Sequence, residues 1–152
     1  MIRWEWLHFA GLDTSTLYAI VAAREEVFVV EQRCAYRDAD GRDPAGWHLI
    51  GRGREGEVAA YLRVLLPGAR FAEHSIGRVL TTAPFRDQGL GRELMLRGLS
   101  RVAEQFGSVP IRIAAQAHLA HFYGSFGFVA VGDPYDEDGI THIDMLRVAP
   151  AG

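Results

Sequence analysis

The chain has 152 residues, of which 49% are apolar, and this suits one domain with a hydrophobic core of its own. Its formal net charge of −3 argues against nucleic acid as a partner, and its single cysteine, Cys34, excludes an internal disulfide. No apolar run is long enough to cross a membrane and the N-terminus lacks the pattern of a signal peptide, so we expect a cytoplasmic protein with no membrane partner.

The first two elements expected are a strand and a long helix. Aromatic residues at alternate positions predict a strand at Trp4–Phe9. Asp13 or Thr14 then caps a helix that runs to about Val30, because apolar residues recur along it at helical spacing.

A polar loop follows at residues 33–46 and carries Asp38, Asp40 and Asp43. Alternating acidic residues are typical of a calcium loop, but the glutamate that such a loop needs at its twelfth position is missing. We therefore expect a solvated loop, or a rim that attracts a cationic amine.

Three strands at Trp47–Gly51, Val58–Leu66 and Ser75–Thr81 are expected to form an antiparallel meander. Residues 51–56 spell Gly-x-Gly-x-x-Gly, the pattern of a dinucleotide-binding turn. They lie between two strands and no helix follows them, so a hairpin turn is the better interpretation.

The most informative stretch is the loop after the third strand of this meander. Arg86, Gly89 and Gly91 form the pattern Arg-x-x-Gly-x-Gly, and a helix runs from Gly89 to Phe106. The first N–H groups of a helix have no intrahelical partner, and glycines let a bulky anion approach them. The predicted ligand is a phosphate or pyrophosphate. A P-loop is excluded because the chain has no lysine, and a dinucleotide fingerprint fails because Leu94 replaces its third glycine.

The remaining elements alternate between strands and one helix. We expect a strand at Ile111–Ala115, a helix at Ala117–Phe126 that ends on the left-handed cap Gly127, and strands at Phe128–Val131 and Thr141–Val148. The last strand is a candidate for pairing across a homodimer.

Two motifs carry a family resemblance. Arg86-x-x-Gly89-x-Gly91 after a strand resembles motif A of the GNAT superfamily, the acetyl-coenzyme A-dependent N-acetyltransferases. Phe122-Tyr123-x-x-Phe126-Gly127-Phe128 resembles motif B, and the elements between the motifs are those the family requires. Stretches 24–32, 36–40 and 137–143 are further similar to the ElaA-type branch of GNAT proteins.

The resemblance implies a single GNAT domain over residues 1–152. Its fold is α/β (α+β), with a mixed, mostly antiparallel sheet of six to seven strands and helices on both faces. Strands Ser75–Thr81 and Ile111–Ala115 are expected to splay apart and admit acetyl-coenzyme A as cosubstrate.

The same resemblance assigns the contacts of the coenzyme. The backbone of Val79, Leu80 and Thr81 pairs with the pantetheine arm, and an N–H near Val79 polarises the thioester carbonyl. Gln116 stands where many relatives carry an asparagine that contacts this arm. The pyrophosphate is expected to bind the backbone N–H groups of Gln88, Gly89, Leu90, Gly91 and Arg92. The side chain of Arg86 would add positive charge there. The side chain of Arg92 is equally suited to adding charge or to lying on a solvated face.

The candidate catalytic residues are an acid and a base. Tyr123 is the candidate acid that protonates the leaving thiolate, and its alternative role is as a core residue of an aromatic cluster. The strand of motif A lacks the glutamate that many GNAT enzymes use as a base. Glu31, His48 and His142 are the remaining candidates, together with a water relay or an amine that arrives neutral.

We therefore expect an N-acetyltransferase that moves acetyl from acetyl-coenzyme A to a primary amine by direct attack in a ternary complex. The acceptor is a small-molecule or peptide amine, and polyamines, amino sugars, aminoacyl compounds and protein N-termini all remain open. The alternatives are a non-catalytic acyl-coenzyme A sensor or interaction module and a nucleotide-binding regulator. No metal is expected, because His118 and His121 belong to no metal-binding pattern.

Overall fold

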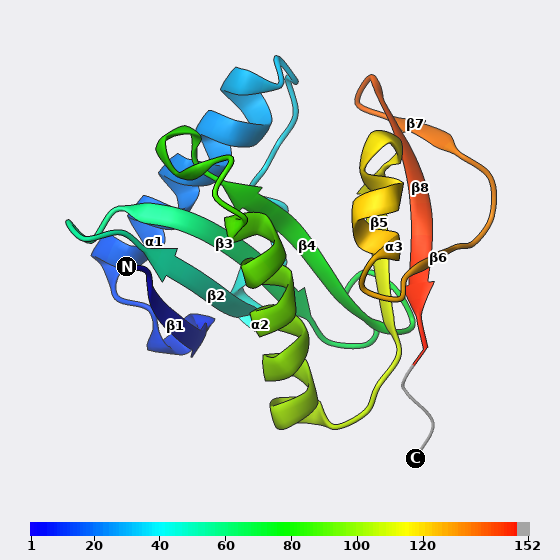
Figure 1. Cartoon of the computed structure of the whole chain (residues 1–152), viewed down its shortest axis with the longest axis horizontal. Helices are drawn as coiled ribbons and strands as arrows, with labels where there is room; N and C mark the ends of the chain where they lie inside the picture. The colour runs from blue at the N-terminus through cyan, green and yellow to red at the C-terminus, as the bar shows by residue number, and fades with distance from the viewer. Residues whose placement is uncertain (149–152) are drawn as a thin grey trace.

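The computed structural model describes residues 1–148, so the predicted single domain over 1–152 extends slightly beyond the described residues. One eight-stranded sheet has the order β1-β2-β3-β4-β5-β8-β6, and β7 pairs with β8 (Figure 1). The strands are β1 Arg3–His8, β2 Trp47–Arg52, β3 Val58–Leu65, β4 His74–Thr81, β5 Ile111–Gln116, β6 Val129–Ala130, β7 Tyr135–Glu137 and β8 Ile140–Arg147. Every pairing is antiparallel except that of β4 with β5.

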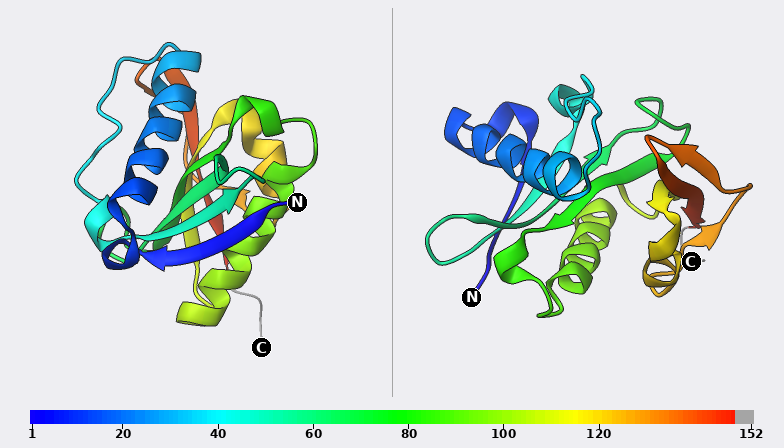
Figure 2. Two further views of the ribbon diagram at one scale, coloured as in Figure 1. Left: turned by 90° about the vertical axis from the view of Figure 1, so that its left-hand side faces the viewer. Right: turned by 90° about the horizontal axis from the view of Figure 1, so that it is seen from above.

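Helices cover both faces of the sheet (Figure 2). Helix α1 and the π-helix η2 lie on one face, and α2 and α3 lie on the other. The helices are α1 Thr14–Arg24, η2 Glu25–Glu31, α2 Leu90–Phe106 and α3 Ala120–Gly124, with short 3-10 turns η1 Phe9–Gly11, η3 Asp43–Ala45, η4 Ala83–Phe85 and η5 Ala117–Leu119. The mixed sheet and the two helical layers confirm the predicted fold class.

Some details differ from the expectations. The sheet has eight strands rather than six to seven, because a hairpin turns at Asp138 and Gly139, both at positive φ, and adds β7. The first helix changes from α to π winding at Glu25, and the helix expected at 117–126 is a 3-10 turn followed by the short α3. Strand β8 pairs with β5 on one edge and with β7 and β6 along most of the other, which leaves little free edge for a partner strand, and a homodimer stays a prediction.

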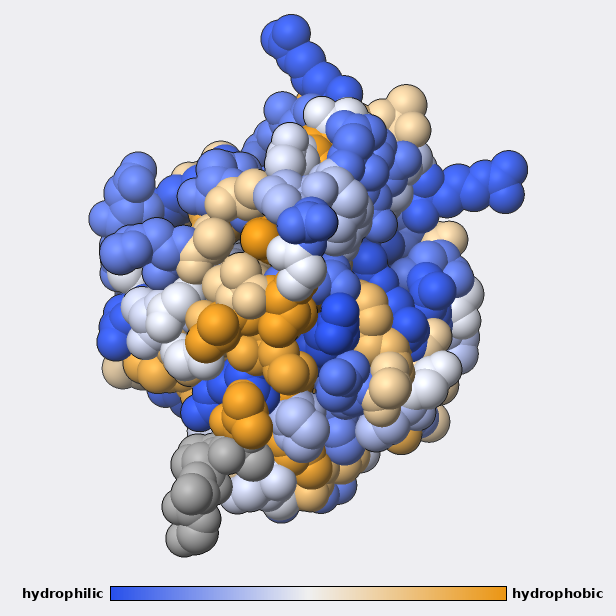
Figure 3. All heavy atoms as spheres, turned by 90° about the vertical axis from the view of Figure 1, so that its right-hand side faces the viewer, coloured by the Kyte–Doolittle hydropathy of each residue, from blue (hydrophilic) through white to orange (hydrophobic). Residues whose placement is uncertain are grey.

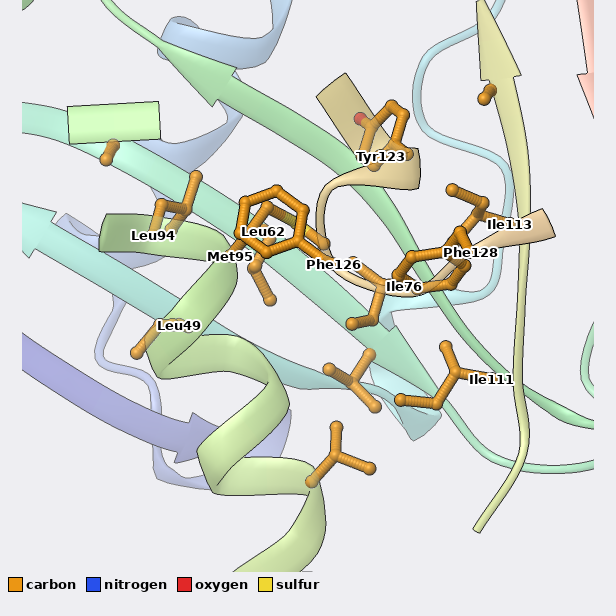
Figure 4. Packing of buried hydrophobic residues seen from close by; sticks show 14 of the residues in the cluster. Leu49, Leu62, Ile76, Leu94, Met95, Ile111, Ile113, Tyr123, Phe126 and Phe128 are labelled. Atoms are coloured by element: carbon orange, nitrogen blue, oxygen red, sulfur yellow. The ribbon is translucent and has the colours of Figure 1, made fainter. Parts of the chain in front are cut away.

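The main core lies between the sheet and helices α2 and α3 (Figure 4). Leu62, Leu94 and Met95 are fully buried there, and each such side chain contributes about 1.5–3 kcal/mol through burial. Gly98 lets α2 approach the sheet closely, because a Cβ at this position would lie 2.7 Å from Cδ2 of Leu62. A second cluster packs under α1 and includes Leu80.

Strand β4 contains a bulge of one residue. Its register with β3 shifts between Gly77 and Leu80, and Arg78 adopts a φ of 53°. As a result Ile76 packs into the core under α2 whereas Leu80 packs into the cluster under α1. Simple alternation would have put these two residues on one face.

The loop at 33–46 is fixed to the sheet by a closed ring of alternating charges, which we call the Arg–Asp ring. The nitrogen–oxygen distances around it are 2.7 Å for Arg24–Asp38, 2.8 Å for Asp38–Arg78, 3.4 Å for Arg78–Asp40, 2.9 Å for Asp40–Arg63, 2.8 Å for Arg63–Asp43 and 2.6 Å for Asp43–Arg24. Arg24 and Arg63 are each only 1% exposed. Buried charges need such partners, and the expectation of a solvated loop or amine-attracting rim is wrong for these aspartates.

The far end of the sheet, at β6 and β8, is less completely covered. Viewed from that side, apolar residues gather in the middle of the surface and polar residues surround them (Figure 3). Val129 of β6 is 65% exposed.

Candidate functional site

The candidate site is a cavity between β4 and β5. These strands pair at His74–Ile111 and Ser75–Arg112 and then diverge (Figure 1). A cavity of about 260 Å³ fills the opening. Residues of η2, the following loop, α3 and the β7–β8 hairpin complete its walls. The expected splaying of the two strands is therefore present.

The start of α2 has the geometry of an anion site. Gly89 precedes the helix at a φ of 74°, a conformation that suits glycine, and no atom lies within 4 Å of a Cβ built on it. The N–H of Glu93 donates to the carbonyl of Gly89 at 3.2 Å, so the N–H groups of Leu90, Gly91 and Arg92 precede the first intrahelical donor. Their partial positive charge fits a pyrophosphate.

Arg86 is engaged at the mouth of the cavity. Its guanidinium donates to the carbonyl of Thr81 at 2.9 Å and forms a 2.6 Å ion pair with Glu31. Two residues expected in separate roles, a cation for the coenzyme and a base, thus neutralise each other. The guanidinium of Arg92 instead lies over the ring of Phe126, with its carbon 5.3 Å from the ring centroid.

Tyr123 joins the aromatic cluster and also lines the cavity. Its ring contacts Phe122 and Phe128 at centroid distances of 5.2 and 6.2 Å, and its hydroxyl points away from Phe128 (Figure 4). Burial raises the pKa of Tyr123 to about 12. The phenol is therefore protonated at neutral pH.

His142 also lines the cavity, from β8. Its Nδ1 is 2.8 Å from the carbonyl of Ile140, and since a carbonyl only accepts, Nδ1 carries the proton of the neutral ring. The lone pair is then on Nε2, which lies 3.6 Å from Oε2 of Glu137. Arg70 approaches the other oxygen of Glu137 at 3.5 Å.

From the sequence, Glu137 stands out only as part of the ElaA-like stretch 137–143, and neither Glu137 nor Arg70 is a predicted site residue. The signal for Glu137 is the Asp138-Gly139 pair, which is a typical two-residue hairpin turn and places its neighbours on paired strands. Arg70 lies in the loop before β4 and has no comparable local signal.

The other candidates have structural contacts. Gln116 lines the cavity and its amide donates to the side chain of Gln32 at 3.1 Å, which links β5 to the end of η2. His48 is fully buried, and its ring nitrogens lie 2.6 Å from the hydroxyl of Tyr61 and 3.2 Å from the carbonyl of Asp43. Burial lowers the pKa of His48, and it does not line the cavity.

Two further features bear on ligands and location. Within residues 1–148, no three histidine, cysteine or acidic side chains lie together as a metal site. No helix in this part of the chain is long and apolar enough to span a membrane.

Comparison with known proteins identifies the family. Residues 46–148 match the model of the acetyltransferase (GNAT) domain. The chain belongs to the GNAT acetyltransferases. It is 42% identical to protein ElaA of Escherichia coli over 149 residues, 97% of each chain, and 44% identical to a UPF0039 protein of Synechocystis sp. over 152 residues, 99% of each.

Solved structures agree with this GNAT assignment. An acyl-CoA N-acyltransferase from Pseudomonas aeruginosa superposes with a TM-score of 0.92 at 43% identity, covering 97% of this chain and all of that one. Escherichia coli ElaA gives a TM-score of 0.90 at 40% identity, covering 97% and 99%. The predicted GNAT membership and ElaA-type branch are confirmed. As a GNAT protein it is an acyltransferase, which uses acyl-coenzyme A and an acceptor.

Proposed function

We propose that this GNAT enzyme transfers acetyl from acetyl-coenzyme A to a primary amine of a small molecule or peptide. The observation that carries the proposal is the cavity between β4 and β5, which Arg86, Tyr123 and His142 line, together with the helix N-terminus of α2, which follows Arg86 along the chain. A binding module has no need of an acid and a base at the same opening.

The coenzyme would be held by backbone groups along its length. Strand β4 pairs with β5 at only two residues and then diverges from it. From Val79 to Thr81, the edge of β4 on the β5 side therefore faces the cavity rather than a partner strand. An amide-bearing chain such as pantetheine pairs with such an edge as a strand does. The N–H groups at Gln88–Arg92 would receive the pyrophosphate.

The chemistry follows from the groups on the cavity walls. An N–H at the β4 bulge stabilises the negative charge that develops on the thioester oxygen. The amine attacks the carbonyl carbon and its proton passes to Nε2 of His142. The carbon–sulfur bond then breaks, and the phenol of Tyr123 gives its proton to the departing thiolate.

The contacts favour His142 over Glu31 as this base. His142 lines the cavity, whereas Glu31 does not, and the carboxylate of Glu31 is engaged in a 2.6 Å ion pair with Arg86. Direct attack is favoured over an acyl-enzyme because the thiol of Cys34 is buried, donates to the carbonyl of Asp138 at 3.4 Å and has its pKa raised by that burial.

The decisive experiment is calorimetric titration with acetyl-coenzyme A, followed by assay of thiol release against a panel of amines. We expect binding, and release with one class of amine. Binding without release on polyamines, amino sugars, aminoacyl compounds and peptide N-termini would favour the sensor reading. Failure to bind acetyl-coenzyme A would overturn the proposal.

A further inference from the structure

We propose that the Arg–Asp ring positions the β4 bulge, so that Asp38 and Asp40 act through Arg78 on the backbone N–H that meets the thioester. This inference rests on the proposed function, because the bulge has this task only if acetyl-coenzyme A binds beside it. It gives the loop at 33–46 a role in the reaction without contact with the reacting atoms.

The first observation is the backbone at Arg78. Its φ of 53° lies in the left-handed region, which residues with a Cβ avoid. Glycine would adopt this conformation freely. The neighbouring glycine, Gly77, does not have a positive φ, so the left-handed conformation falls on the arginine instead. Strained backbone of this kind persists where the surroundings hold it, and it concentrates at functional sites.

The second observation is what holds Arg78. Its Nε lies 2.8 Å from Oδ1 of Asp38, and its Nη2 lies 3.1 Å from the backbone carbonyl of Asp38 and 3.4 Å from Oδ2 of Asp40. The guanidinium also lies over the ring of Tyr36, at 5.5 Å from its centroid. Two hydrogen bonds from Nη2, the nearby carboxylate of Asp38 and the ring face of Tyr36 thus hold one side chain, and through it the twist of the bulge.

The third observation is that the ring reaches both the scaffold and the cavity. Arg24 comes from α1 and Arg63 from β3, and both are buried. Arg78 and Tyr36 line the cavity itself. The ring therefore connects the rigid layers of the fold to the wall of the site.

Stability alone does not account for such a ring. Replacing a buried ion pair by apolar side chains of similar volume is often neutral or stabilising. Five hydrogen-bonded ion pairs and one further close charged contact, between Nε of Arg78 and Asp38, instead select one arrangement of the groups that they join. A bulge that aims a backbone donor needs this kind of constraint, since small misplacements of a donor are costly to the rate.

The test is isotope-edited infrared spectroscopy of acetyl-coenzyme A labelled with ¹³C at the thioester carbonyl. Bound to the unaltered protein, the carbonyl band should lie at lower wavenumber than in solution, because a donor polarises it. Arg78→Gly keeps a backbone suited to the bulge and removes its anchor, and Asp40→Asn keeps the volume and removes the charge. Both variants should lose most of the shift while the Kd for acetyl-coenzyme A stays within about threefold.

Arg42→Ala is the matched control. Arg42 also contacts Asp40, at 3.3 Å, but from the solvent side, with its side chain 40% exposed. This variant should keep the full shift. If Arg78→Gly does not fold, Asp40→Asn carries the comparison.

The outcomes separate this inference from the proposed function. Binding with an undiminished carbonyl shift in folded Arg78→Gly or Asp40→Asn overturns the positioning role and leaves the transferase intact. Binding to the unaltered protein without any shift also overturns it. If acetyl-coenzyme A does not bind at all, the proposed function fails and this inference fails with it.

Discussion

The hydroxyl of Tyr123 is separable from the packing of its ring. The ring is 7% exposed and belongs to the aromatic cluster, so Tyr123→Phe preserves the core and removes only the proton. We expect kcat to fall by about 100-fold or more, as for loss of a general acid, with little change in the Kd for acetyl-coenzyme A. Steady-state kinetics beside calorimetry measures both. Tyr18→Phe, at a site 78% exposed, should have no effect. An unchanged kcat in Tyr123→Phe contradicts the assignment.

His142 and Glu31 make opposite predictions as candidate bases. His142→Gln should lower kcat by about 100-fold, because the proton acceptor is lost. Glu31→Gln removes the ion pair with Arg86 and should act mainly on KM for acetyl-coenzyme A, since Arg86 stands at the mouth of the cavity. The kinetics of the two variants on one amine decide between them. A larger loss of kcat in Glu31→Gln would exchange the roles.

Among the elements, the loop at 33–46 should set the acid stability of the protein. Burial alone raises the pKa of Asp40 and Asp43, but bonds from Arg63, Arg24 and the N–H of Arg42 outweigh it and hold both pKa values below the ordinary 3.8. A carboxylate with a lowered folded pKa contributes stability above about pH 4, and that contribution is lost as the pH falls through the folded pKa.

We therefore expect the free energy of unfolding, measured in urea, to decline steeply from about pH 5 to pH 2. Asp43→Asn should be less stable at neutral pH, because Arg24 and Arg63 each lose a charged partner, and its decline with acid should be shallower. Parallel curves for the two proteins would show that Asp43 does not contribute in this way.

Local signals in the sequence predicted the elements that depend on neighbouring residues. The glycine pattern before α2 and the alternation in β3 and β5 are of this kind, and the resemblance to GNAT proteins supplied their order. The β4 bulge could not be predicted, because Ile76 and Leu80 satisfy simple alternation in the sequence. Only the pairing of β4 with β3 reveals the shift in register. The Arg–Asp ring could not be predicted either, because its members come from α1, β3, β4 and a loop. Charge pairing between segments far apart in the chain leaves no periodic pattern in the sequence.

The site was predictable to a similar extent. The loop at Gly89 and the tyrosine of motif B came from contiguous motifs, and Arg86 of the first motif and Tyr123 of the second line the cavity. The pairing of Arg86 with Glu31, and the place of Glu137 beside His142, depend on tertiary contacts between segments far apart in the chain.

For the molecule as a whole, ligand binding should appear as thermal stabilisation. A ligand at 100 times its Kd adds about 2.7 kcal/mol to the free energy of unfolding, which raises the Tm of a domain of this size by roughly 5–10 °C. We expect this shift with acetyl-coenzyme A in a thermal melt. ATP at the same concentration should give little shift. Equal shifts with both would support the nucleotide-binding alternative.

The parting of β4 and β5 leaves two strand edges that face each other inside the sheet. An unpaired edge on the outside of a protein is a template for strands of other chains and promotes aggregation. Here each edge is screened by the opposite strand, by η2 and by the β7–β8 hairpin, all of which border the cavity. The unpaired backbone groups of β4 and β5 are thus accessible to a slender ligand but not to a strand of another polypeptide.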